Sequence, residues 1–442
     1  EGEFSDKWCF TYEYDAWGNI VMRHVPGGGK QYYIHDARDR QVLSTNSELM
    51  SKGWWRYSEY DALNRITEEG LCKLEAGVTL SDLMGSVPQI TDYSEYITGE
   101  VILHTLSYQD GVSQSQNGFT PVSGVVTYYN RDVSHNRFRL SGERNWEAPA
   151  LSNNISQPVY YVDRKYFYDY RGLPVQVAES CSDGWSGRTS MKYDFSGKVL
   201  VSVEEHTSPG GTTDRLTLQN TYDDRGRILQ SSAAINGAIL SATYSYDDLG
   251  RMVVKNLNGS DAEDRFSYNL QGWLTSIVSG NGGSIDICNR AIQYYDNSGN
   301  PMYGGKISSL SASHYGAATF FTDYSYDRLG RLVSEARKTG YSGTIPFSAD
   351  RYNYDRNGNI ISVSHRSGTE IEAIMETCFR TGNRLERILI EEEDEYPEQF
   401  TYDMNGAVTY DGYAHCSITR NVLGKPCTIE FEAGSTRENY YL

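Results

Sequence analysis

The sequence predicts an all-β protein built as a repetitive antiparallel array of β-hairpins. A Tyr-Asp-x-x-Gly signature recurs about ten times along the chain, and 42 Gly with 11 Pro in 442 residues suit a chain with many turns. Tyrosine is unusually frequent, with 36 Tyr against 13 Phe, while the hydrophobic content is only 38%. Because tyrosine buries its ring and keeps its hydroxyl hydrated or hydrogen-bonded, this composition favours a thin, curved sheet with water on one or both faces.

The stretch 322–335 shows how one signature specifies a hairpin. Tyr324 and Tyr326 alternate with polar residues, which is the period-2 pattern of a half-buried strand. Asp327 can accept a hydrogen bond from the backbone two residues on, and Gly330 supplies the positive φ that closing such a turn usually needs. The residue after the Gly is often Arg, as in Arg331, and we expect it to form polar pairs across neighbouring strands.

Close copies of this signature run through the chain. From Tyr168 to Tyr354 the successive tyrosines are about 22 to 31 positions apart, which leaves room for two strands and two turns per unit. Periods of this size indicate arrays in which each unit buries its apolar face by stacking on its neighbours. The positions that we assign to the repeat are Tyr14, Asp15, Gly18, Tyr60, Asp61, Tyr168, Asp169, Gly172, Tyr193, Asp194, Gly197, Tyr222, Asp223, Gly226, Tyr246, Asp247, Gly250, Tyr268, Gly272, Tyr295, Asp296, Gly299, Tyr326, Asp327, Gly330, Tyr354, Asp355, Gly358, Tyr402, Asp403 and Gly406.

These Tyr-Asp-x-x-Gly-Arg units resemble the YD repeats of the Rhs family, which bacterial polymorphic toxins, insecticidal toxin complexes and animal teneurins share. The resemblance is weaker up to about Tyr160 and strong from Tyr161 onward; Thr381-Gly382-Asn383-Arg384-Leu385 is also similar to the bacterial version. It implies a long β-sheet that spirals into a hollow shell. It also implies a bacterial protein that is secreted or lies on the cell surface.

We expect residues 1–160 to form an irregular YD-repeat region with insertions and residues 161–442 to form a regular array, as one elongated unit. Both ends of the sequence lie inside the repeat pattern, so we expect a fragment of a larger protein.

Four segments outside the signature carry local predictions. Residues 47–52 are expected to form one or two helical turns ending at Gly53, and residues 79–84 a brief helix. Residues 125–129 read as a strand, and residues 143–158, with two Pro and three Asn, as a long loop.

The charge balance limits the classes of partner. A net charge of −18 with no evident basic stripe disfavours binding to nucleic acid and to anionic membranes. The acidic run 391–395 is best explained as a solvated loop, with a cation-binding or cargo-facing patch as the alternative. No apolar run approaches 18 residues, so the sequence predicts no membrane span in this segment.

No catalytic or metal-binding pattern is evident in the sequence. Residues 26–30 (Pro-Gly-Gly-Gly-Lys) lack the spacing of a phosphate-binding loop, there is no Gly-x-Ser-x-Gly, and the eight His include no HExxH pair. The seven Cys are scattered without a CxxC and indicate isolated small hydrophobes. We therefore predict no enzyme, no cofactor and no metal. The release reaction of toxin members uses Asp-Pro-x-Gly motifs; this sequence has no Asp-Pro, so that activity is assigned to no residue.

Exposed aromatic residues on a β surface can stack on sugar rings. The candidates are Trp54, Trp55, Trp146, Trp185 and Trp273, with structural packing as the favoured alternative for each.

Together these features favour a non-enzymatic β-shell segment that encapsulates a polypeptide cargo or the remainder of its own chain. The alternative is a cell-surface adhesin or carbohydrate-binding YD-repeat module, which predicts an exposed aromatic cluster in residues 71–160. A glycosidase carried by the repeats would need two carboxylates about 5–10 Å apart in a cleft.

Overall fold

A computed structural model of the chain describes residues 8–86, 93–109, 118–131, 138–259, 262–281, 285–295, 302, 304–339, 348–368, 370–380, 384–390, 398–432 and 434–438. Asp296, Gly299, the acidic run 391–395 and residues 381–383 lie outside this description.

The predicted all-β class is confirmed: nearly all of the regular structure is one long antiparallel sheet. The strands are β1 (Thr11–Tyr14), β2 (Ile20–Val25), β3 (Gly29–His35), β4 (Gln41–Asn46), β5 (Trp55–Tyr60), β6 (Ile66–Leu74), β7 (Ile97–Gln109), β8 (Leu140–Trp146), β9 (Tyr161–Tyr168), β10 (Pro174–Cys181), β11 (Ser186–Tyr193), β12 (Val199–Thr207), β13 (Thr213–Tyr222), β14 (Ile228–Ile235), β15 (Ala238–Tyr246), β16 (Met252–Leu257), β17 (Ala262–Tyr268), β18 (Leu274–Gly280), β19 (Asp286–Gln293), β20 (Ser309–His314), β21 (Phe320–Tyr326), β22 (Leu332–Thr339), β23 (Ser348–Tyr354), β24 (Ile360–Ser367), β25 (Glu370–Arg380), β26 (Arg384–Ile390), β27 (Glu398–Tyr402), β28 (Val408–Asp411), β29 (Cys416–Arg420), β30 (Pro426–Phe431) and β31 (Thr436–Glu438). The helices are α2 (Ser47–Ser51), α3 (Leu80–Ser86) and the 3-10 turn η1 (Tyr93–Tyr96).

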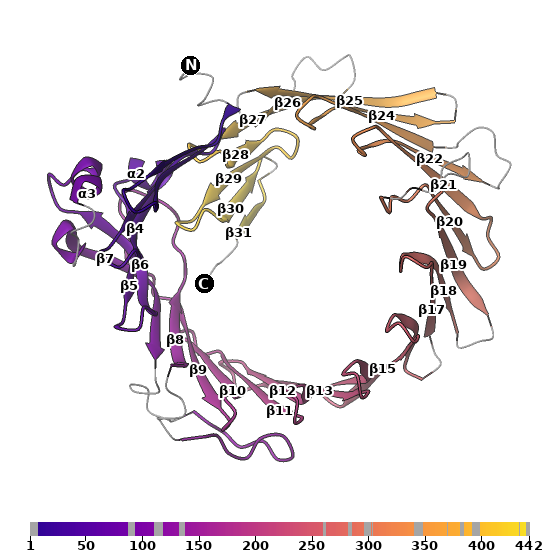
Figure 1. The fold of residues 1–442 in the computed structure, drawn as a ribbon, viewed down its shortest axis with the longest axis horizontal. Coiled ribbons are helices and arrows are strands. Elements are labelled where there is room, and N and C mark those ends of the chain that lie inside the picture. Colours follow the sequence, from indigo (N-terminus) through magenta and orange to yellow (C-terminus); the bar gives the residue numbers. More distant parts are fainter. Residues whose placement is uncertain are drawn as a thin grey trace.

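Each strand pairs antiparallel with the next one along the chain, so the sheet is a continuous meander from β1 to β31. Figure 1 shows this meander curled into a ring, with β28–β31 on the inner side of the wall that β2–β6 form. In the described part of the chain β1 pairs with β2 and β31 with β30, and these two strands do not pair with each other. The sheet is therefore not closed by strand pairing, and its end overlaps its beginning.

The turn of each repeat is held by its aspartate. In the β21–β22 turn the Asp327 amide donates to the Arg331 carbonyl, and the Gly330 amide donates to the Asp327 carbonyl, both at 2.9 Å. The Asp327 carboxylate accepts from the amides of Leu329 and Arg331, also at 2.9 Å. Gly330 has a φ of 81°, a conformation that side chains with a Cβ rarely adopt. The aspartate thus satisfies backbone donors that the turn would otherwise leave open.

The tyrosine of each repeat fastens its unit to the preceding one. The Tyr326 hydroxyl donates to the carbonyl of Ile307 at 2.8 Å, and Ile307 comes two residues after the glycine of the preceding turn, Gly305. The same bond, always to the residue two positions after the preceding turn's fourth residue, is made by Tyr60, Tyr193, Tyr222, Tyr246, Tyr268, Tyr294 and Tyr354. Neighbouring units are therefore joined by a side chain as well as by the strand ladder.

The residue after the glycine also links neighbouring units, because it contacts both its own turn and the tyrosine of the next unit. The guanidinium of Arg331 lies 2.6 Å from the Asp327 carboxylate, sits 4.5 Å from the ring centre of Tyr354, and donates to the carbonyl of Asp355 at 3.0 Å. Arg40, Arg227 and Arg251 repeat this pattern in their own turns. The prediction of cross-strand pairs for this residue was wrong, because it pairs within its own turn and reaches the next one.

One assigned unit is corrected by the structure. Tyr294, and not Tyr295, donates to the carbonyl of Leu274 (2.8 Å), while Tyr295 is exposed. The glycine with positive φ in this unit is Gly305, and Lys306 lies over the ring of Tyr326. The sequence between Tyr294 and Gly305 is longer than in the other units, so a search for the fixed five-residue spacing found the neighbouring Tyr-Asp pair instead.

The local predictions had mixed outcomes. Helix α2 forms as predicted, with the Asn46 side chain accepting from the Leu49 amide at its N-terminus, and α3 lies one to two residues later than predicted. The strand at 125–129 was wrong: this segment makes only an isolated bridge from Val122 to Val126. The loop at 143–158 was wrong in its first part, because β8 runs to Trp146 and is paired with β9 through ion pairs such as Arg144–Asp163 at 2.6 Å.

A valine at Gly330 is expected to loosen the β21–β22 turn. A β-branched residue resists a φ of 81°, at a cost of roughly 1–2 kcal/mol, and its Cβ would meet the end of the Lys306 side chain. Trypsin should therefore cleave faster after Arg328 and Arg331 in Gly330→Val. Gly304→Val is the matched control, because Gly304 lies in the preceding turn without positive φ and with open space around its Cβ. Equal cleavage of both variants would contradict the role assigned to Gly330.

Removal of one tyrosine hydroxyl is expected to weaken the contact between two units. Tyr326→Phe leaves the Ile307 carbonyl without its donor, which should lower the free energy of unfolding by about 0.5–1.5 kcal/mol in urea titration. Tyr315→Phe is the control, because Tyr315 is an exposed tyrosine of the neighbouring β20–β21 turn. A loss of the same size in both variants would show that the hydroxyl bond between units is not the cause.

The turn aspartates predict an acid-sensitive wall. Hydrogen bonds from the Arg331 backbone and side chain lower the pKa of Asp327 from its ordinary 3.8, and the pKa values of Asp223 and Asp247 are lowered in the same way. A lowered pKa in the folded state gives stability that is present above the ordinary pKa and is lost as the pH falls through the lowered pKa. Thermal unfolding should therefore shift to lower temperature below about pH 4. Asp327→Asn should reduce this pH dependence, since Asn269 holds the same position in its own turn; an unchanged pH profile would contradict the assignment.

Candidate functional site

The wall of the ring is a single sheet whose two faces are both accessible. Along β13 to β24 nearly every described side chain is exposed or half-buried on both faces; the buried ones within strands are Gly280 and Cys288. Apolar burial is concentrated elsewhere, in two clusters around β3–β7 and a third beneath the segment 118–131. The regular part of the array therefore presents two solvated surfaces instead of enclosing a core.

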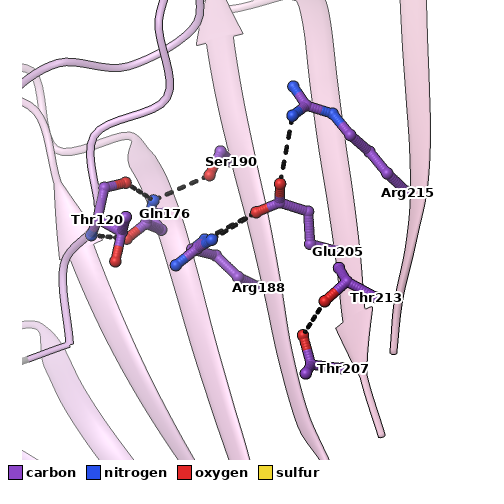
Figure 2. A network of polar contacts seen from close by, with 8 residues as sticks. All are labelled: Thr120, Gln176, Arg188, Ser190, Glu205, Thr207, Thr213 and Arg215. Atoms are coloured by element: carbon purple, nitrogen blue, oxygen red, sulfur yellow. Dashed lines mark hydrogen bonds and ion pairs between the residues drawn. The ribbon is translucent and has the colours of Figure 1, made fainter. Parts of the chain in front are cut away.

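The segment 118–131 covers part of the outer face. It crosses the outside of β9–β12 (Figure 1), where Val122 and Val126 pack with Phe167, Val175 and Val203. Figure 2 shows how it is fastened: the buried Gln176 accepts from the Thr120 amide (2.9 Å) and donates to the Thr120 carbonyl (2.8 Å) and to Ser190 (2.9 Å). Because directly opposed residues share a face, this identifies the Gln176 side of the sheet as the outer one and the side with the repeat tyrosines as the inner one.

A polar cleft of about 240 Å³ lies beside this segment, lined by Asp163, Lys165, Arg188 and Glu205 among others. Its charges pair across the strands: Arg188 lies 2.5 Å and Arg215 3.3 Å from the Glu205 carboxylate, as Figure 2 shows. Arg144 donates to the Asp163 carboxylate, and this hydrogen bond raises the pKa of Arg144. The pairing of these carboxylates with guanidinium groups favours a structural network in this cleft.

The overlap of the two ends of the ring forms a seam. Val422 is buried in one apolar cluster with Leu49, Trp54, Leu71, Ile102, Ala148 and Ile155. The backbones also meet, since the Val422 amide donates to Pro149 (3.0 Å), the Leu151 amide donates to Arg420 (3.1 Å), and Arg56 donates to the Val422 carbonyl (2.7 Å). A cavity of about 360 Å³ lies at the seam, between α2, the turn 403–405 and β29.

The seam turn is a repeat unit that the sequence analysis missed. The Asn421 side chain accepts from the amides of Leu423 and Lys425, and Gly424 has a φ of 77°, as in the Asp-x-x-Gly turns. Asn replaces the usual Asp, and Arg420 stands where the tyrosine is expected, so only the x-x-Gly-Lys ending remained as a signal.

The tryptophan candidates do not gather into one surface. Trp54, Trp55 and Trp146 are buried, so their ring faces are not available to a sugar, which corrects their candidacy. Trp54 and Trp55 belong to the apolar clusters around β3–β7. Trp273 packs against Tyr294 with ring centres 5.0 Å apart, and Trp185 is exposed in the β10–β11 turn. The described residues thus leave a single exposed tryptophan of the five.

Among the described residues, no three or more His, Cys, Asp or Glu side chains gather in a way that could hold a metal ion. Cys9, Cys72, Cys181, Cys288, Cys416 and Cys427 are free thiols, and burial raises the pKa of Cys72 to about 12. A thiol with so high a pKa is a poor nucleophile. Within the described part of the chain, no helix has the length and apolar character needed to cross a membrane.

Comparisons by sequence and by structure gave different results. No protein-family model matches the sequence, and no curated protein matches it. The fold is similar to the crystal structure of TcdB2-TccC3-TEV, with a TM-score of 0.59 and 14% identity over 98% of this chain and 19% of that chain. A structure of TcdB2-TccC3 matches 97% of this chain and 27% of its own, with 11% identity and a TM-score of 0.36.

The chain spans about a fifth of the length of TcdB2-TccC3-TEV. At 14% identity the similarity concerns the fold alone. It agrees with the fold that the resemblance implied: over nearly its whole length, this chain has a fold similar to part of TcdB2-TccC3-TEV.

Proposed function

We propose that this chain is a non-enzymatic wall segment that encloses a polypeptide cargo, either a separate chain or a continuation of its own. The observation that carries the proposal is a single-layer sheet, accessible on both faces, that curls into a ring and overlaps itself at a seam (Figure 1). Because no second layer covers the inner face of this sheet, that face is available to contact a polypeptide inside the ring. The proposed setting, a secreted or surface protein of the toxin-complex kind, is supported by the similarity to TcdB2-TccC3-TEV.

The inner face suits a polypeptide better than a small ligand. It carries the repeat tyrosines and the aromatic residues two positions before them, mixed with paired charges such as Arg164 with Glu143 and Glu179. Rings with a polar edge and ion pairs give an extended amphipathic surface, which can contact apolar and polar groups of a chain without one fixed binding pose.

Enclosure predicts that a peptide attached at the C-terminus is sheltered. In Figure 1 the last strand, β31, lies inside the ring, on the inner side of the wall that β2–β6 form, so a C-terminal fusion continues from the inner layer. A flexible peptide with a site for a sequence-specific protease would be fused to either end of separate proteins. We expect cleavage of the C-terminal fusion to be several-fold slower than cleavage of the N-terminal fusion. Equal rates would overturn enclosure.

The seam provides a matched variant for this experiment. Val422→Asp places a carboxylate in the apolar cluster around Trp54, at a cost of several kcal/mol, and should open the overlap. Cleavage of the C-terminal fusion should then approach that of the N-terminal one. Val159→Asp, the same change at an exposed valine before β9, is the control and should leave the sheltering intact. Far-ultraviolet circular dichroism would show whether each variant keeps its sheet.

A further inference from the structure

Apolar side chains stand at the tips of many repeat turns. All these turns join an odd-numbered strand to the following even-numbered strand, so they lie at one end of the strands, which we call the turn rim. The two residues between the Asp or Asn and the Gly form each tip. Phe195 and Leu270 are 99% exposed there, Leu329 77% and Leu249 75%, and Trp17 and Leu63 are exposed as well. The turn itself does not require apolar tips, since Asp224 and Asp248 hold the same position as Phe195 and Leu270.

At the seam the same tip position is seen buried. Val422 is the first tip residue of its turn, as Phe195 and Leu270 are of theirs, and it is only 4% exposed within the cluster around Leu49 and Trp54. The apolar tip of this turn thus already serves as a contact to another part of the wall.

The seam also shows which part of the wall receives a tip. The Met404 amide donates to the Glu48 carboxylate (2.6 Å), and Gly406 lies against the Gly27 carbonyl so closely that a Cβ would not fit. Gly27 lies in the β2–β3 turn and Glu48 lies in α2 between β4 and β5, both at the opposite ends of the strands, which we call the opposite rim. The turn rim of the last strands therefore rests on the opposite rim of the first strands.

The opposite rim carries exposed apolar residues beyond the seam too. Ile239 beside the β14–β15 turn is 70% exposed and Tyr315 in the β20–β21 turn is 73% exposed, and Trp185 stands in the β10–β11 turn. Both the turn rim and the opposite rim thus present exposed apolar side chains. At the seam, a turn rim already contacts an opposite rim.

We propose that the exposed turn rim is an association surface for the opposite rim of a second copy of this chain, stacked head to tail. The proposed contact continues the seam, where the β27–β28 and β29–β30 turns already contact residues at or near the opposite rim of β2–β5. Such a contact is heterologous and does not close on itself, so its extent should rise with protein concentration. The charge of −18 on each copy opposes stacking, so added salt should favour it.

Sedimentation velocity of the 442-residue chain over a wide concentration range tests this proposal. We expect the sedimentation coefficient to rise with concentration and with salt. In the double variant Phe195→Asp with Leu270→Asp the dissociation constant should rise by about tenfold or more, because two apolar contacts are lost. Both substitutions install the residue found at Asp224 and Asp248, so the turns should still form. The reverse change, Asp224→Phe, adds a tip and should strengthen association.

The control is Gln219→Glu with Gln230→Glu, which adds the same charge at exposed positions of β13 and β14 away from either rim. Stacking through the rim requires that this control associates like the original chain. A monomeric original chain at every concentration would overturn the proposal, and so would equal weakening by the tip variants and the control. Sheltering of a C-terminal peptide is measured on the ring itself, so either result leaves the enclosure proposal to its own experiment.

Discussion

The hydrogen bond from each repeat tyrosine to a carbonyl of the preceding unit is the contact on which the rest of the wall depends. A sheet without a second layer cannot rely on a deep core, and the described strands from β13 to β24 bury almost nothing. Stability must then come from contacts in the plane of the sheet, between units that touch only their neighbours. Tyr246 makes two contacts to the preceding unit with one side chain. Its hydroxyl donates to the Ile228 carbonyl, and the Arg227 guanidinium lies 4.5 Å from the centre of its ring.

The signature Tyr-Asp-x-x-Gly-Arg is therefore one device with three linked parts. The aspartate holds the turn, the glycine allows its backbone, and the arginine links the aspartate to the next tyrosine. In Arg251 these roles meet, since it binds Asp247 at 2.7 Å, lies over Tyr268 and donates to the Asn269 carbonyl. At the two x positions the turn uses backbone groups, such as the Leu329 amide, and does not depend on one type of side chain. These positions are free to vary, which is why Phe195, Arg225 and Asp248 can all occupy turn tips.

Sequence reasoning succeeded where the structure is set by local contacts. The strands, the turn glycines and α2 follow from patterns within a few residues, because the Asp-held turn is itself local. It failed where a residue serves a distant partner: the apolar 125–129 segment has strand-like composition but packs across Phe167, and Val422 belongs to a degenerate turn whose partners lie in residues 49–155. The hydrophobic periodicity of a segment does not indicate which distant residues it contacts. The ring and the seam were therefore beyond prediction from the pattern alone.

The seam explains how a linear repeat acquires a defined shape. A meander joined only between neighbours can continue at any curvature, so something must fix where it meets itself. Here Arg420 takes the place of the tyrosine: its guanidinium donates to the Val408 carbonyl of the preceding unit (3.2 Å), and its own carbonyl accepts from the Leu151 amide. Val422 occupies a tip position whose residue differs from turn to turn, and here it is buried in the apolar cluster of the seam. The seam unit thus keeps its contact to the preceding unit and adds, through its buried tip, a contact to the opposite part of the wall, which fixes where the ring meets itself.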